Sequence, residues 1–252
     1  SALGTECYNS CFVLSDGDEH FLVDGGGGNG ILSQLKKAGF NWQDMRTIFV
    51  THKHMDHILG AVWMIRMICQ HMKKGSYEGG HDEVIALLRE MAMQLLNKKE
   101  TVYIGDRLHL VEVNDGDTKE IMGKKVTFFD TGSTKTKQFG FCMDMGDGAK
   151  ITCCGDEPYN DCEEKYARGS KWLLHEAFCL YSEADIFDPY EKHHSTVKDA
   201  CELAEKIEVQ NLLLYHTEDK NITHRKGLYV AEGKRYYSGN LHVPDDLEKI
   251  RL

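Results

Sequence analysis

Apolar residues in the first fifty positions follow two different spacings. Short apolar runs at 11–14 and 20–23 flank a polar turn that contains a glycine, which is typical of a β-hairpin. Residues 31–39 have the spacing of an amphipathic helix and end at a glycine. The apolar run at 47–50 then predicts a further strand. This part of the chain therefore mixes strands with a helix.

The rest of the chain continues this alternation without a repeat or a linker. We expect helices at 58–73, 83–97, 161–168 and 196–207, and strands at 108–113, 125–130, 139–144, 149–154, 171–176 and 211–215. Residues 75–82 are predicted to be a loop, and the tail after 215 to form turns and short strands. This order favours an α/β (α+β) protein, a four-layer αββα sandwich in a single domain over residues 1–252.

Composition narrows the classes of partner. The 252 residues carry 30 basic and 40 acidic side chains, a formal net charge of −10, which disfavours broad binding to nucleic acid. No apolar run is long enough to cross a membrane. The nine cysteines are odd in number and form no CxxC pair, so we expect reduced thiols and a cytoplasmic protein.

The stretch "IFVTHKHMDHILG" at 48–60 carries the strongest chemical signal. It places His52, His54, Asp56 and His57 within six positions, directly after a predicted strand. Imidazole and carboxylate together suit zinc, iron or manganese. Two neighbouring ions would suit all four groups, and such an ion pair catalyses hydrolytic displacement.

One loop does not complete two metal sites, so more distant ligands are needed. Asp156 follows the predicted strand at 149–154, and His216 follows the strand at 211–215. Each is a polar residue of ligand type at the end of an apolar strand. A carboxylate such as that of Asp156 can bridge two cations, because each oxygen can serve one ion.

These motifs resemble the metallo-β-lactamase superfamily, in particular its ribonuclease Z-like branch. "THKHMDH" is similar to the family signature THxHxDH. Further similar features are "LVDGGGG", "FGF" at 139–141, "GDE" at 155–157, "LLHEAF" at 173–178, "HST" at 194–196 and "LLLYHTED". The resemblance covers nearly the whole chain in the right order and implies an αββα fold with a two-metal site at one edge.

The resemblance also implies roles for individual residues. His52 and His54 would hold the first metal, Asp56, His57 and His216 the second, and Asp156 would bridge them. His194 would be the general acid, and Glu176 would orient its imidazole. The cofactors would be two divalent ions, zinc first, with manganese and iron as alternatives.

Two departures from the branch change the expectation. Gly132, Ser133 and Thr134 stand where the family supplies a further histidine, so we expect a weaker first metal site. The projecting basic arm with which ribonuclease Z grips transfer RNA is missing as well. The stretch after Asp156 is short and acidic, which argues against transfer RNA processing.

We therefore expect a metal-dependent hydrolase whose metal-held hydroxide attacks a small phosphodiester while His194 protonates the leaving group. Asp56 counts among the catalytic residues, since its loss should abolish turnover. A lactone, carboxylic ester or sulfate ester is the alternative substrate. The rival hypothesis is a non-catalytic descendant of the family that only binds a metal or a ligand. Its evidence is Gly132, which stands where the family has a histidine. The expected partner is a small-molecule ester, with no membrane, and a homodimer is left open.

Several other residues receive structural interpretations. His81 and Glu83 are expected to be solvated, His193 to be exposed and His109 to be a strand residue. The glycines at 25–28 lack the following Lys-Ser/Thr of a phosphate loop, so we expect a tight turn behind the histidine loop.

Overall fold

The computed structural model describes residues 4–72 and 74–252, which form two compact units. Residues 8–123 make up the N-terminal unit. Residues 124–252, joined by 4–7, make up the C-terminal unit. Within the latter, the backbone N–H groups of Thr5 and Glu6 donate to the carboxylate of Asp219.

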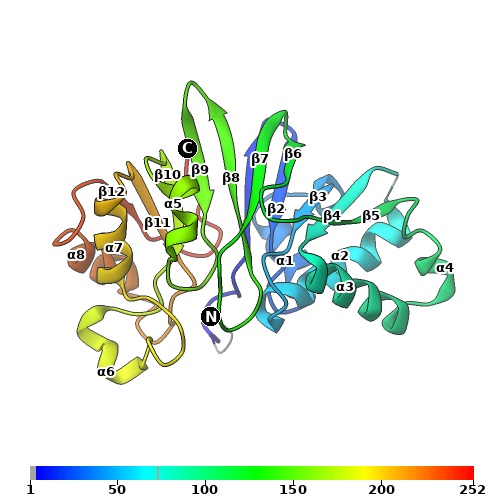
Figure 1. Ribbon diagram of the computed structural model, residues 1–252. Coiled ribbons are helices and arrows are strands. Elements are labelled where there is room, and N and C mark those ends of the chain that lie inside the picture. Colours follow the sequence, from blue (N-terminus) through cyan, green and yellow to red (C-terminus); the bar gives the residue numbers. More distant parts are fainter. Residues whose placement is uncertain (1–3, 73) are drawn as a thin grey trace. The chain divides into compact units, whose positions relative to one another are not determined.

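The N-terminal unit is a sheet in the order β1-β2-β3-β4-β5 with helices packed on it (Figure 1). Its strands are β1 Phe12–Asp16, β2 Glu19–Val23, β3 Thr47–Phe49, β4 Ser76–Gly80 and β5 Leu108–Glu112. The helices are α1 Gly30–Lys37, α2 Met55–His71, α3 Asp82–Leu95 and α4 Lys98–Thr101, with the short 3-10 helix η1 Trp42–Asp44 and strand β6 Thr118–Ile121. Buried apolar side chains of β2 and β3 join those of α1, α2 and α3 in one core.

The C-terminal unit is built on the strand order β12-β11-β10-β9-β8-β7. Its strands are β7 Lys124–Asp130, β8 Phe139–Gly146, β9 Ala149–Cys153, β10 Trp172–Glu176, β11 Asn211–Tyr215 and β12 Asn240–His242. Its helices are α5 Glu164–Ala167, α6 Ala184–Phe187, α7 Val197–Lys206 and α8 Arg225–Gly233, with 3-10 helices η2 Asp161–Glu163 and η3 Tyr181–Glu183. Helix α7 packs on β10 and β11, and α8 packs on α7 and β12 (Figure 1).

Two predictions of local structure are wrong. Residues 75–82 contain strand β4, which pairs in parallel with both β3 and β5. Its two glycines and its buried Glu78 give no apolar alternation, so the sequence resembles a loop. The tail forms helix α8 as well as strand β12. The short elements α4, β6 and α6 were not predicted. The hairpin and the other expected strands lie within a few residues of their predicted positions.

Parallel pairing determines where the loops meet within each unit. Strands β2, β3 and β4 run in parallel, as do β9, β10 and β11. The carboxyl ends of parallel strands lie at the same edge of a sheet. The loops after β2 and β3 therefore share one edge, and those after β9, β10 and β11 share another. No helix of the described residues is both long and apolar enough to span a membrane.

Candidate metal centre

The histidine loop of the N-terminal unit joins β3 to α2. His54 is the N-cap residue of α2, and its carbonyl oxygen accepts hydrogen bonds from the N–H groups of His57 and Ile58, both at 3.0 Å. Asp56 and His57 thus occupy the first helical turn, where the helix dipole favours a carboxylate. Helix α2 begins at Met55, three positions before the predicted start at residue 58.

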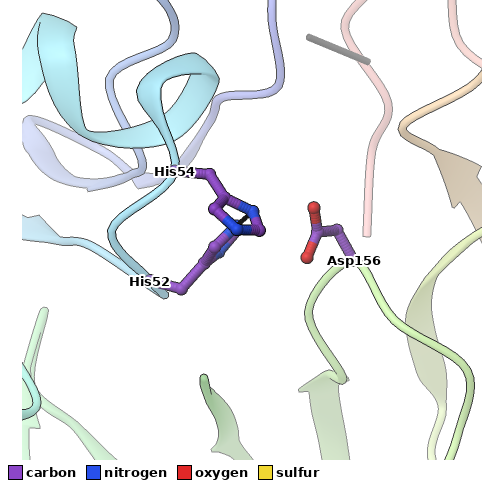
Figure 2. Close-up of side chains that lie close together, drawn as sticks. All are labelled: His52, His54 and Asp156. Atoms are coloured by element: carbon purple, nitrogen blue, oxygen red, sulfur yellow. Dashed lines mark hydrogen bonds between the residues drawn. The ribbon is translucent and has the colours of Figure 1, made fainter. Parts of the chain in front are cut away.

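The first two histidines present nitrogen atoms to each other. His52 Nε2 lies 2.9 Å from His54 Nδ1, and the hydroxyl of Thr51 lies 3.0 Å from the other ring nitrogen of His52. Figure 2 shows the side chains of His52 and His54 converging from the histidine loop, so that their imidazoles meet. A zinc–nitrogen bond measures about 2.0–2.1 Å, so both nitrogens can reach one ion. His52 is fully buried, which keeps competing water from its ring.

Asp24 orients the other histidine of the loop. Its buried carboxylate lies 2.7 Å from His57 Nδ1 and accepts hydrogen bonds from the backbone N–H of Thr51 at 2.8 Å and its hydroxyl at 3.0 Å. Nε2 of His57, 3.6 Å from Oδ2 of Asp56, is therefore the ring nitrogen that could serve as a metal ligand. A carboxylate behind a metal-binding histidine fixes its tautomer and raises its basicity. Asp24 was not among the residues predicted for the site, although its position before four glycines marks a tight turn.

The glycines after Asp24 are needed because two backbones touch. The N–H of Gly25 donates to the carbonyl of His57 at 2.8 Å, and the N–H of Gly60 donates to the carbonyl of Gly26 at 2.9 Å. A Cβ atom on Gly25 would lie 2.3 Å from the amide nitrogen of Ala61. The prediction of a tight turn behind the histidine loop is therefore confirmed.

In the C-terminal unit, Asp156 and His216 lie together. Asp156 follows β9, His216 follows β11, and His216 Nε2 is 3.3 Å from Asp156 Oδ2. His216 has a positive φ of 55°, an uncommon conformation that turns the chain directly after the strand. Parallel strands thus bring together two ligand-type groups that are 60 positions apart in sequence. Figure 2 draws the Asp156 carboxylate on its loop.

His194 and Glu176 form a second pair in this unit. His194 Nδ1 lies 3.6 Å from Glu176 Oε2, and neither atom has another hydrogen-bond partner among the described residues. The other oxygen of Glu176 accepts the backbone N–H of Ser195. The imidazole stacks on Phe178, with ring centroids 5.1 Å apart, and lies 5.0 Å from the ring of His216.

The surroundings of His194 affect its protonation in opposite directions. Burial by itself lowers the pKa of the imidazole, because a charged ring is poorly solvated there. Glu176 acts against this effect through its hydrogen-bonding carboxylate and its negative charge, and the charge of Asp156 adds to it. Together they outweigh burial and raise the pKa of His194 above its ordinary value. His194 is thereby favoured in its protonated form, which a proton donor requires.

Gln138 is a further contact of Asp156 that the sequence did not reveal. It is fully buried and directly precedes β8. Its amide group donates to Asp156 Oδ1 and accepts the backbone N–H of Asp156 at 3.1 Å. A glutamine in a polar loop carries no periodic or motif signal, so only the folded chain identifies it.

The structure thus groups the predicted residues by unit. His52, His54, Asp56 and His57 lie together in the N-terminal unit, and Asp156, Glu176, His194 and His216 in the C-terminal unit.

Other predicted residues have mixed outcomes. Contrary to the prediction, His81 is fully buried at the carboxyl end of β4. Glu83 is exposed and pairs with Lys53 of the histidine loop at 2.7 Å. His109 lies in β5, and His193 is exposed, as predicted.

Comparisons with known proteins agree with the motif analysis. A family model described as anti-Pycsar protein Apyc1 matches residues 1–234. The chain is 23% identical over 291 residues to ribonuclease Z of Thermococcus sibiricus, an alignment that spans 95% of this chain and 89% of that protein.

Solved structures show the same fold. The metallo-beta-lactamase fold protein YhfI from Bacillus subtilis matches with a TM-score of 0.73 at 18% identity, over 95% of this chain and 89% of its own. A diphosphatase from the PhnP family matches with a TM-score of 0.69 at 17% identity, over 95% of this chain and 82% of its own. The expected metallo-β-lactamase fold and the likeness to the ribonuclease Z branch are therefore confirmed.

Proposed function

The chain belongs to the family of anti-Pycsar protein Apyc1, and from this membership and its oriented histidine and aspartate groups we infer that it is a metal-dependent hydrolase of a small phosphodiester. The orientation of the imidazoles is the observation that carries the proposal. His57 is held through Nδ1 by the Asp24 carboxylate, so its Nε2 is directed away as a ligand atom. A purely structural histidine has no need of such an arrangement beside three other metal-binding groups.

The donor atoms fit divalent metal ions. Imidazole nitrogen and carboxylate oxygen are the ligands that zinc takes in catalytic sites, with manganese and iron as alternatives. We assign His52 and His54 to the first ion. We assign Asp56, His57 and His216 to the second, with Asp156 shared by both. The missing histidine near Gly132 leaves the first ion with fewer protein ligands.

When bound, the ions would activate a water molecule and stabilise negative charge on phosphoryl oxygens. The protein's own residues supply the proton transfer. Glu176 faces Nδ1 of His194 at 3.6 Å, which leaves Nε2 to donate a proton to the departing oxygen. Stacking on Phe178 restricts the rotation of the ring. Glu176 acts through His194 and is a positioning residue.

Charge and chain length favour a small substrate. With a net charge of −10, the protein has no broad basic field to attract a long polyanion. The segment between Asp156 and α5 is short and acidic, so it offers no arm for transfer RNA. The structural likeness to a diphosphatase supports chemistry at phosphorus. A lactone would not need His194 as a general acid, whereas a phosphodiester with a basic leaving oxygen would.

A substrate panel tests the proposal. The full chain, loaded with zinc or manganese, is assayed with bis(p-nitrophenyl) phosphate, p-nitrophenyl phosphate, p-nitrophenyl acetate and p-nitrophenyl sulfate. We expect metal-dependent turnover of the diester, abolished by Asp56→Ala and retained by Asp18→Ala in the exposed β1–β2 turn. Turnover of the acetate or sulfate alone would replace the phosphodiester with the alternative ester class. No turnover of any compound by fully metal-loaded protein would favour the binding descendant.

A further inference from the structure

The loop 131–138 is closed at its base by Gln138. The carbonyl oxygen of Gln138 accepts the backbone N–H of Thr131 at 3.0 Å and its hydroxyl at 3.1 Å. Gln138 is fully buried, while Gly132, Thr134 and Lys135 of the same loop are exposed. The residue that links this loop to β8 is therefore buried, whereas the middle of the loop is exposed.

The side chain of Gln138 contacts Asp156 with both ends of its amide. The amide nitrogen donates to Oδ1 of the carboxylate, and the amide oxygen accepts the backbone N–H of Asp156 at 3.1 Å. The preceding residue makes room for this contact. Gly155 has a φ of +80°, and a Cβ atom there would lie 2.1 Å from the amide oxygen of Gln138. Two unrelated requirements, the positive φ and the close amide, thus both call for glycine at 155.

Only a primary amide of this length makes both contacts. A glutamate would accept the N–H of Asp156 but, when ionised, would not donate to its carboxylate. Methionine would fill the space without either hydrogen bond, and asparagine is one methylene too short to reach both groups. With Oδ1 held by Gln138, Oδ2 is the oxygen that lies 3.3 Å from His216 Nε2.

The backbone at Gly132, near which the family has its further histidine, is unfavourable for a histidine side chain. Gly132 has a φ of +72°, which side chains other than glycine rarely adopt, and a Cβ there would lie 3.1 Å from Cys162 Sγ. The N–H of Gly132 donates to Oδ1 of Asp130 at 2.8 Å, which fixes this turn. The loop therefore contributes to the site through Gln138 at its end.

We propose that Gln138 is a positioning residue for the metal-binding carboxylate of Asp156, so that the loop 131–138 supports a metal ligand in place of supplying one. This inference rests on the proposed function, since it needs a metal at Asp156. The N–H donated to Oδ1 fixes the plane of the carboxylate before the ion arrives. Loss of an outer partner of this kind typically weakens metal binding about 10–100-fold.

The test measures zinc affinity of the full chain after removal of metal, by competition with a chromophoric chelator. We expect Gln138→Met and Gln138→Asn each to bind zinc about 10–100-fold more weakly than the natural chain. Gln210→Met, at an exposed position of the same unit, is the matched control and should bind as the natural chain does. The free energy of unfolding of each metal-free variant is measured in parallel.

A merely structural role for Gln138 would lower the metal-free unfolding free energy and leave zinc affinity within about twofold of the natural value. That result in either folded variant would overturn the inference and leave the proposed function intact. If the natural chain itself binds no zinc, manganese or iron, the proposed function fails, and the inference fails with it. Weaker zinc binding by a variant whose metal-free stability is preserved would support the positioning role most directly.

Discussion

The carboxylate of Asp24 lies 2.7 Å from Nδ1 of His57, although the two residues are 33 positions apart. The same carboxylate accepts both the N–H and the hydroxyl of Thr51. One side chain thereby ties the end of β2 to the loop after β3 and to the first turn of α2. The histidine loop is held in position by this contact independently of any ion.

Replacing Asp24 with asparagine should weaken metal binding. The carboxylate accepts the N–H of Thr51 through one oxygen and contacts His57 through the other. An asparagine amide has only one oxygen, so it cannot accept hydrogen bonds from both residues in this way. We expect zinc affinity to fall about 10–100-fold, measured by competition with a chelator. Asp18→Asn, in the exposed turn between β1 and β2, is the control. An unchanged affinity in Asp24→Asn would show that Asp24 serves the fold alone.

Replacing His194 with alanine should reduce activity according to the leaving group. A general acid contributes about 10²–10⁴-fold when the leaving oxygen is strongly basic, and little when it is p-nitrophenolate. We therefore expect a large loss of kcat for an alkyl phosphodiester and a small one for bis(p-nitrophenyl) phosphate. An equal loss for both would mean that His194 does not donate the proton.

The Glu176→Gln variant should shift the pH dependence of activity. The amide oxygen can still accept the N–H of Ser195, but the charge that raises the pKa of His194 is gone. The pKa of His194 then falls, and the imidazole loses its proton at a lower pH. We expect the alkaline limb of the kcat profile to move toward acid, in measurements with an alkyl diester. A profile that keeps its position would argue against coupling between Glu176 and His194.

Stepwise removal of metal should reveal two ions of unequal affinity. The proposed first ion has His52, His54 and the shared Asp156, whereas the second has Asp56, His57, His216 and the same shared group. The ion with fewer protein ligands should be released first during dialysis against increasing chelator, followed by elemental analysis. Two ions released together, with equal affinity, would contradict the expectation of a weaker first site.

Gly25→Ala should destabilise the N-terminal unit strongly. The added Cβ would lie 2.3 Å from the amide nitrogen of Ala61, a backbone atom that cannot move aside. We expect the free energy of unfolding to fall by about 2–4 kcal/mol, as for other overpacked sites. Gly17→Ala, at a position with a φ of +58° and no neighbour within 4 Å, should cost only about 1 kcal/mol, because its added Cβ meets no backbone atom. Equal costs in urea denaturation would show that the Gly25 contact is not rigid.

Glu78 should make stability fall as the pH rises. Both of its oxygens are buried without a hydrogen-bond partner among the described residues, and burial raises the pKa of its carboxyl well above 4.5. Below pH 4.5 the group is protonated in the folded and the unfolded chain alike. Above that pH the unfolded chain loses its proton first, which favours unfolding until the folded group also ionises.

The Glu78→Met variant removes this proton linkage. Its unfolding free energy should exceed that of the natural chain by an amount that grows between pH 5 and pH 8. Each tenfold difference in proton affinity between the folded and unfolded states corresponds to about 1.4 kcal/mol. Glu112→Met, at an exposed position of β5, should show no such trend in the same urea titrations. A constant difference at all pH values would mean that the folded group is already ionised.

Strands and helices that depend on the pattern of neighbouring residues could be predicted from the sequence. The apolar run before His52 predicts β3, and the runs before Asp156 and His216 predict β9 and β11. Ligand-type residues at the ends of these strands identified the candidate site, because the end of a strand is where a loop side chain can turn toward a shared edge. The sequence failed for β4, whose buried Glu78 and two glycines break the alternation on which strand prediction depends.

The sequence by itself determined which residues have metal-binding chemistry and which strands and helices present them, because side-chain type and local periodicity are properties of neighbouring positions. Tertiary structure alone decided how those residues are oriented. Asp24 contacts His57, and Gln138 contacts Asp156, across long separations in sequence. The burial of His81 likewise depends on elements that are distant in sequence. Hydrogen bonds across such separations form only when the chain folds, so no local pattern records them.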